Sequence, residues 1–275
     1  MKELLNSVER ISSDHHSGSG EILKMYFKLF KDSLKSDDLK SEGERKKLLA
    51  QVIKLQAGHN VFFIVRHFLK EIEIFFQSKH ADWFKEWSEF ISEYELTWEN
   101  INDRIATHTV STIQMENKTI LLHSNSSTLK DLFRIQKKNS YRIRIIQTES
   151  RPVMEGRLQA RYLARHGYNV TLITDASIAR SAEKIDFSIL GADAVYRDFF
   201  VNKCGSRLIA LVCKDKQIPL FVLADSRKLW INQPQSDVNE TFQENVKSSA
   251  EIWKNPPPGI LAENYYFERI PNDLV

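Results

Sequence analysis

The spacing of apolar residues changes about two fifths of the way along the chain. Up to about residue 110, apolar side chains recur at steps of three and four, which is typical of amphipathic helices. Glycine and proline, which interrupt helices, are rare in this region. We expect the aromatic residues near its end to pack between helices: Trp83, Phe84, Trp87, Phe90 and Tyr94. The pattern predicts a helical N-terminal domain over residues 1–112.

From about Lys118, short β-branched runs alternate with helical segments. Strands are expected at residues 119–123, 142–147, 169–174, 187–190 and 220–224. Helices are expected at residues 127–138, 154–166, 177–183 and 205–215. Strands that alternate with helices indicate a parallel sheet covered on both faces. Residues 113–275 are therefore predicted to form a Rossmann-like α/β domain with a doubly wound, mostly parallel sheet.

Composition adds little to this picture beyond exclusions. The 275 residues are 42% hydrophobic and 27% charged, which is ordinary for a globular protein. A net charge of +3 gives no reason to expect direct binding to nucleic acid. Cys204 and Cys213 fall in one expected helix, nine positions apart, so a disulfide between them is not expected. The sequence shows neither a secretory signal nor an apolar run of membrane-spanning length, and we expect a cytoplasmic protein without a membrane partner.

Polar residues follow each expected strand. In open parallel sheets, ligands bind in the crevice beyond the carboxyl ends of the strands. The residues at these positions are His123 to Ser127, Thr148 to Arg151, Asp175, Gly191 to Asp193, and Asp225. Small polar and ionisable side chains at one edge of the sheet favour binding of a small polar ligand.

The first of these turns has the sequence His-Ser-Asn-Ser-Ser, at residues 123–127. A strand followed by small hydroxyl residues and a helix places free backbone N–H groups at a helix N-terminus, which favours a phosphate. The alternative is a plain helix cap by Ser126 or Ser127. A nucleophilic role for Ser124 is less favoured, because the Gly-x-Ser-x-Gly turn of serine hydrolases is absent.

The familiar cofactor and metal motifs are also absent. The sequence has no dinucleotide-binding Gly-x-Gly-x-x-Gly after a strand, no Walker loop, no Cys-x-x-Cys and no His-Glu-x-x-His. Asp14-His15-His16 is interpreted as an exposed polar turn, and we expect neither a metal nor a cofactor. The Ser/Gly cluster at residues 17–20 precedes a helix and is a second candidate anion site.

Two longer segments carry a family resemblance: TESRPVMEGRLQARYLARHGYNVTLITDA (residues 148–176) and LGADAVYRDFFVNKCGS (residues 190–206). They resemble the translation initiation factor 2B family, in particular its alpha, beta and delta subunits, most strongly over residues 115–230. Methylthioribose-1-phosphate and ribose-1,5-bisphosphate isomerases share this fold. The resemblance implies a phosphosugar or nucleotide pocket between the two domains. It also implies assembly as a homodimer or with related family subunits.

The resemblance also assigns residues to the pocket. In the isomerases a cysteine and an aspartate handle protons, and the aspartate of the Gly-Ala-Asp motif corresponds to Asp193. An Asn-Lys pair that contacts substrate corresponds to Asn202 and Lys203, and a phosphate-contacting glycine to Gly18. If the chain is an isomerase, the catalytic residues are Asp193 and Ser124. The predicted ligand-binding set is Gly18, Ser19, Ser124, Ser126, Arg151, Glu155, Asp193, Asn202 and Lys203.

Two positions depart from the isomerase pattern. Ser124 stands where the isomerases have the cysteine, and an alcohol is a much poorer acid than a thiol, whose pKa is about 8.5. Glu155 stands where they carry glutamine. Both changes favour a regulatory protein that binds a phosphosugar or a nucleoside monophosphate without turnover. The alternatives are an isomerase that converts an aldose 1-phosphate to a ketose 1-phosphate, and a structural subunit that needs partner chains.

Overall fold

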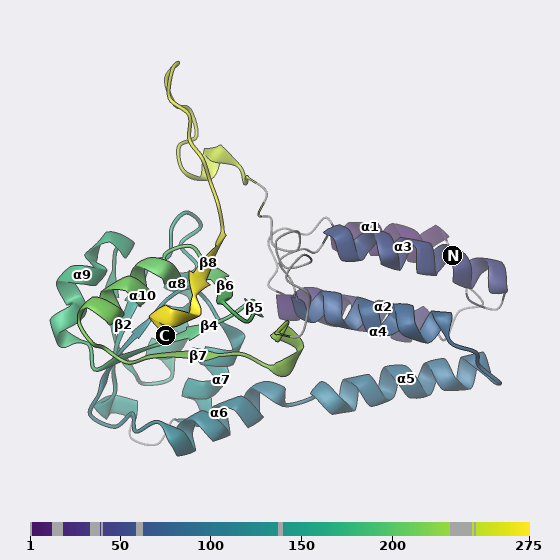
Figure 1. Ribbon diagram of the computed structural model, residues 1–275, viewed down its shortest axis with the longest axis horizontal. Coiled ribbons are helices and arrows are strands. Elements are labelled where there is room, and N and C mark those ends of the chain that lie inside the picture. Colours follow the sequence, from purple (N-terminus) through teal and green to yellow (C-terminus); the bar gives the residue numbers. More distant parts are fainter. Residues whose placement is uncertain are drawn as a thin grey trace. The chain divides into compact units, whose positions relative to one another are not determined.

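The computed structural model describes residues 2–12, 19–33, 39, 41–58, 63–136, 140–231, 244 and 246–275. These residues form two compact units, Met1–Glu99 and Asn100–Val275 (Figure 1). Asp14-His15-His16 and Gly18, which the sequence singles out, lie outside the described residues.

The first unit is built from helices. Their bounds are α1 Lys2–Ser12, α2 Ser19–Ser33, α3 Glu42–Gly58, α4 Phe63–Gln77 and α5 Trp83–Trp98. The helical stripe of α2 buries Ile22, Tyr26 and Phe30 in one core with Phe68 of α4 and Trp87 of α5. The expected aromatic packing between helices is thus observed, and the predicted helical N-terminal region is confirmed.

The second unit contains a five-stranded parallel sheet. Its strands are β1 Thr119–Leu122, β2 Arg144–Thr148, β3 Asn169–Ile173, β4 Phe187–Gly191 and β7 Leu220–Leu223. The strand order is β3-β2-β1-β4-β7, and every neighbouring pair is parallel. The chain winds outward from β1 through β2 to β3 and then returns to β4 on the other side of β1. This reversal is the point at which ligands bind in doubly wound sheets.

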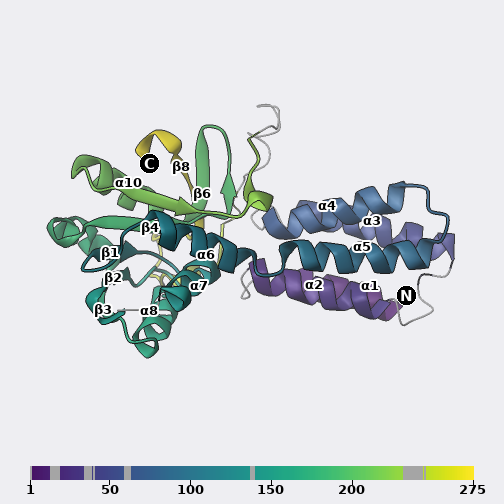
Figure 2. The ribbon, with the colours of Figure 1, turned by 90° about the horizontal axis from the view of Figure 1, so that it is seen from below.

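Helices cover both faces of this sheet (Figure 2). One face is covered by α6 Ile101–Thr112, α7 Ser127–Ile135 and α8 Gly156–Arg165. On this face, Ile120 and Leu122 of β1 pack with Leu129 and Phe133 of α7. The other face is covered by α9 Ile178–Ser181 and α10 Ser206–Asp215, and Leu121 of β1 packs in one core with residues of both helices. Successive strand residues point to opposite faces, so β1 is buried on both sides. The predicted doubly wound α/β fold is confirmed.

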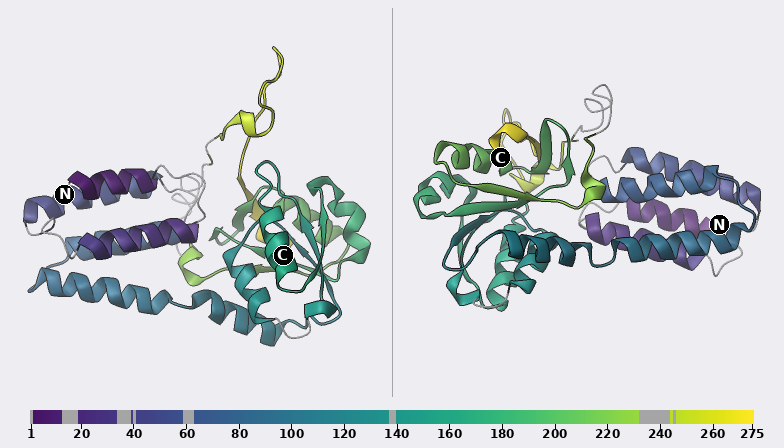
Figure 3. Two further views of the ribbon diagram at one scale, coloured as in Figure 1. Left: turned by 180° about the vertical axis from the view of Figure 1, so that it is seen from behind. Right: turned by 60° about the horizontal axis from the view of Figure 1, so that its bottom comes forward.

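A second, antiparallel sheet was not expected from the sequence. It consists of β5 Ala194–Val195, β6 Phe199–Lys203 and β8 Phe267–Pro271, in the order β5-β6-β8. These strands are labelled in Figure 1, and Figure 3 gives two further views of the same ribbon. Because β6 is held extended by β8, α10 begins at Ser206 and Cys204 lies in the turn before it. The expectation that both cysteines share one helix is therefore wrong. They remain unpaired.

Short 3-10 turns complete the second unit, at Ser140–Arg142, Asp175–Ser177, Ala182–Lys184, Ser226–Lys228, Ser249–Glu251 and Asn272–Leu274. Within the described ranges, no helix combines the length and the apolar character needed to cross a bilayer.

Candidate functional site

The turns that follow β1, β2 and β3 are bonded to one another. Ser124 and Ser150 both have left-handed backbones, with φ values of 63° and 61°. The Ser124 N–H donates to Ser150 Oγ at 2.8 Å, and the Ser150 N–H donates to Asp175 Oδ1 at 2.8 Å. Three strand ends are thereby fixed in one arrangement, and the Ser124 side chain is oriented by a rigid turn.

Buried His123 joins this arrangement to the turn before α10. Its Nε2 donates to the Cys204 carbonyl at 2.8 Å, and its Nδ1 lies 2.6 Å from Thr148 Oγ1. Burial lowers the pKa of His123, so the ring is neutral and Nδ1 accepts from the Thr148 hydroxyl. A Cβ on Gly205, where φ is 103°, would lie 2.8 Å from His123 Cε1. His123 therefore positions the surrounding turns.

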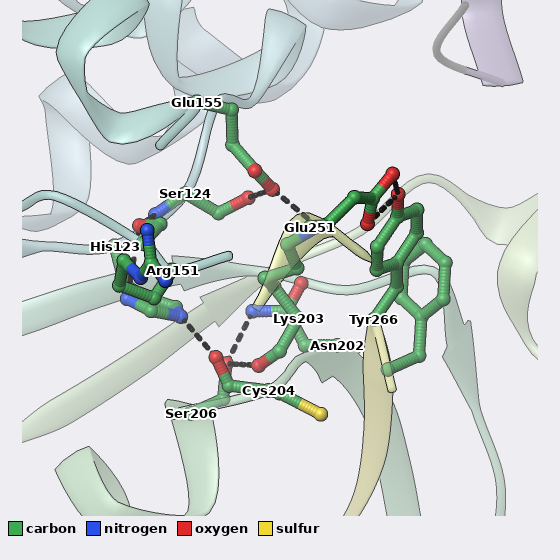
Figure 4. Close-up of polar contacts among 12 residues, drawn as sticks. His123, Ser124, Arg151, Glu155, Asn202, Lys203, Cys204, Ser206, Glu251 and Tyr266 are labelled. Atoms are coloured by element: carbon green, nitrogen blue, oxygen red, sulfur yellow. Dashed lines mark hydrogen bonds and ion pairs between the residues drawn. The ribbon is translucent and has the colours of Figure 1, made fainter. Parts of the chain in front are cut away.

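A buried ion pair occupies the middle of the site. Lys203, the last residue of β6, places Nζ 2.6 Å from Glu155 Oε1 (Figure 4). The Ser124 hydroxyl donates to the same oxygen at 3.1 Å. The Lys203 and Glu155 side chains are only 7% and 16% exposed. The other oxygen of this carboxylate, Oε2, is buried and has no hydrogen-bond partner among the described residues.

An aromatic ring lies beside this ion pair. The ring centroid of Tyr266 is 4.3 Å from Lys203 Nζ, within the range of a cation–π contact. The Tyr266 hydroxyl donates to the Glu251 carboxylate at 2.6 Å, and Glu244 accepts the backbone N–H groups of Tyr266 and Phe267. The ring is therefore held in place from two directions. The sequence gives no signal for it, because Tyr266 reaches Lys203 only through the pairing of β6 with β8.

Asp193 follows β4 and differs from the other acids of the site. Its N–H donates to Val201 O at 2.8 Å, but its carboxyl group makes no hydrogen bond or ion pair with the described residues. Burial raises the pKa of Asp193 and the negative charge of Glu155 raises it further, while Lys228 and Lys203 act in the opposite direction. A carboxyl group with a raised pKa and unused hydrogen-bonding capacity can hold a proton or accept one from a ligand.

Two of the predicted ligand-binding residues are engaged in structural bonds. Ser126 caps α7, and its hydroxyl accepts from the Leu129 N–H at 3.4 Å, as the plain-cap alternative predicts. The buried Asn202 side chain donates to Ser206 Oγ at 2.8 Å. Both lie beside the site, but these hydrogen-bonding groups are already used inside the protein.

The remaining predicted residues differ in their placement. Arg151 is exposed at the edge of the site, and its N–H donates to Asp175 Oδ2 at 2.7 Å. Ser19 is the first residue of α2 in the first unit. Gly18 lies outside the described residues. The second unit thus brings together Ser124, Glu155 and Lys203, with Asp193 within electrostatic reach.

Residues 25–275 match the Initiation factor 2 subunit family. The chain belongs to this family. A putative translation initiation factor eIF-2B subunit 2-like protein of Pyrococcus horikoshii is 34% identical over 134 residues, which are 48% of this chain and 49% of that protein. The match thus spans about half the length of that relative. A ribose 1,5-bisphosphate isomerase of Archaeoglobus fulgidus is 24% identical over 284 residues, covering 100% of this chain and 87% of the enzyme.

A solved structure has the same fold as this chain. The crystal structure of the translation initiation factor eIF-2B of Pyrococcus horikoshii OT3 superposes with a TM-score of 0.75, at 21% identity, over 100% of this chain and 94% of that chain. The match of residues 25–275 to the family confirms the predicted family. Its members include both factor-like proteins and sugar-phosphate isomerases, so the activity has to be argued from the site itself.

Proposed function

We propose that this chain is a regulatory, non-catalytic member of the family that binds a phosphosugar or a nucleoside monophosphate at the carboxyl ends of β1, β2, β4 and β6. The observation that carries the proposal is the hydrogen bond from the Ser124 hydroxyl to Glu155, whose carboxylate pairs with Lys203. An alcohol is a weak acid, and an adjacent carboxylate disfavours loss of its proton. Ser124 is therefore a poor substitute for a thiol in proton transfer.

A phosphosugar offers the two kinds of group that this edge of the sheet can bind. Its hydroxyls can donate to the carboxyl groups of Glu155 and Asp193. Its anionic group can reach the exposed cation of Arg151, whose guanidinium has no ion pair within the described part of the chain. In keeping with the resemblance, the proposal includes self-association or assembly with related subunits, in the cytoplasm.

Phosphorus NMR tests binding and turnover together. The purified protein is titrated with ribose-1,5-bisphosphate, methylthioribose-1-phosphate, AMP and GMP in turn. We expect shifted or broadened ligand signals without new product signals. Lys203→Ala should weaken binding, because it leaves the Glu155 carboxylate without its counter-ion and so disturbs the position that takes the sugar hydroxyls, whereas Lys214→Ala on the exposed side of α10 should not. Absence of binding by every ligand would refute the proposed function, and product signals would refute its non-catalytic part.

A second candidate function, isomerisation of an aldose 1-phosphate, is favoured by one observation. Asp193 has a raised pKa and no bonded partner among the described residues, as a proton-transferring acid requires. Under this candidate, Asp193→Asn abolishes turnover while binding is retained, and Ser124→Cys increases turnover. Turnover that survives Asp193→Asn would exclude Asp193 as the proton carrier.

A further inference from the structure

The surroundings of the Lys203 ammonium group are already occupied by protein. One side contacts Glu155 Oε1 at 2.6 Å, and the face of Tyr266 lies on another, at 4.3 Å. The pair is largely buried, so its charges are weakly screened by solvent. A phosphate approaching Lys203 would have to lie against the Glu155 carboxylate or displace it. The first places two negative charges at short range, and the second breaks the ion pair between Lys203 and Glu155, so both cost electrostatic energy.

The unused hydrogen-bonding capacity of the site belongs to acids. Glu155 Oε2 is buried without a partner among the described residues, and the carboxyl group of Asp193 likewise makes no bond within them. Buried polar atoms in folded proteins are nearly always hydrogen-bonded, so a ligand is the natural source of a partner for Glu155 Oε2, and Asp193, which is partly exposed, can bind the same ligand. Carboxylate oxygens need donors. Hydroxyl groups supply donors, whereas a phosphate dianion supplies only acceptors.

We infer that Glu155 sets the charge selectivity of this site: the position at Lys203, Glu155 and Asp193 takes the uncharged, hydroxyl-bearing part of a ligand and excludes anions. This inference rests on the proposed function, since it assigns the sugar portion of the ligand to this position and any phosphate to another. Glu155 is thus an internal anion that competes with external ones for Lys203.

The test compares two glutamate variants that are matched in charge and exposure. Glu149 lies in the same β2–α8 connection, its side chain is also 16% exposed, and it also forms an ion pair, with Arg157 at 2.9 Å. Each of the variants Glu155→Gln and Glu149→Gln is titrated with inorganic phosphate by calorimetry. We expect Glu155→Gln to bind phosphate roughly tenfold or more tightly than the wild-type protein, because one negative charge beside Lys203 is removed. Glu149→Gln should match the wild type.

Three further proteins make the result specific. Glu155→Asp keeps the charge and should bind phosphate as weakly as the wild type. The double variant Glu155→Gln, Lys203→Met should lose the increase in phosphate affinity. That loss would show that the phosphate bound by Glu155→Gln contacts Lys203. Glu155→Ala removes the same charge and replaces the glutamine variant if circular dichroism shows that the latter is unfolded. A parallel titration of the wild type with ribose, followed by proton NMR, should show binding that Glu155→Gln weakens.

Equal phosphate affinity in the wild type and Glu155→Gln would overturn the inference. So would a gain that persists without Lys203, or a similar gain in Glu149→Gln or Glu155→Asp. The result of this test can be distinguished from the result of the ligand titrations that test the proposed function. If the wild type binds none of the phosphorylated ligands but Glu155→Gln gains phosphate affinity through Lys203, the proposed function fails and the charge selectivity stands.

Discussion

Substitution of Gly205 by alanine tests the contact between the turn before α10 and buried His123. Gly205 has a φ of 103°, and a Cβ there would lie 2.8 Å from His123 Cε1 and 3.0 Å from Nε2. His123 cannot move aside without stretching its hydrogen bond to the Cys204 carbonyl. Left-handed backbone strain costs roughly 1–2 kcal/mol and overpacking of a buried neighbour roughly 1–3 kcal/mol. We therefore expect the free energy of unfolding of the second unit to fall by roughly 2–5 kcal/mol.

Gly259→Ala is the matched control for the backbone strain. Gly259 has a φ of 90°, but a Cβ there would meet no atom within 4 Å. This variant should therefore lose at most roughly 1–2 kcal/mol, and the difference between the two variants isolates the contact with His123.

The assay is urea unfolding followed by hydrogen exchange of peptides from β1 and β4, which belong to the second unit. Tryptophan fluorescence is less suitable, because it mixes the signals of both units: Trp83, Trp87 and Trp98 lie in the first, and Trp230 and Trp253 in the second. If Gly205→Ala loses no more stability than Gly259→Ala, the contact with His123 does not hold this turn, and the reasoning fails.

Two further predictions concern the same turn. Burial lowers the pKa of His123, so below its ordinary value of 6.5 the unfolded chain takes up the proton first. Stability should therefore fall with decreasing pH by up to about 1.4 kcal/mol per pH unit, and His123→Gln should remove this slope in urea titrations; an unchanged slope would contradict the prediction. Glu268 Oε1 accepts the N–H groups of Gly205 and Arg207, so Glu268→Ala should lower stability by about 1 kcal/mol. A loss equal to that of exposed Glu263→Ala would show that this cap does not contribute.

Much of the fold could be predicted from local patterns. Helices and strands have different periods, and the sequence Thr-Ile-Leu-Leu at β1, buried at every position, is typical of a central parallel strand. The stripe in α2 likewise predicts which face is buried, although Met25 on its margin is 38% exposed. These features depend on neighbouring residues alone. The family resemblance was carried by contiguous segments and could be recognised for the same reason.

The antiparallel sheet could not be predicted in this way. β6 pairs with β8, whose residues lie far along the chain, and the register sets Asn202 opposite Glu268. Nothing within β6 specifies that partner, because strand pairing is decided by packing in three dimensions. The same pairing keeps Cys204 out of α10 and brings Tyr266 to Lys203. Errors in the sequence-based prediction concentrate where distant strands meet.

The candidate site divides along the same line. The sequence by itself determined that Ser124 and Asp193 follow strands of a parallel sheet, because strand and turn patterns are local. Only the tertiary structure decided that Glu155 pairs with Lys203 and accepts from Ser124, and that His123 is buried and neutral. The physical reason is that ion pairing and pKa shifts depend on distances and solvent access between groups far apart in sequence. Those distances exist only once the strands have assembled.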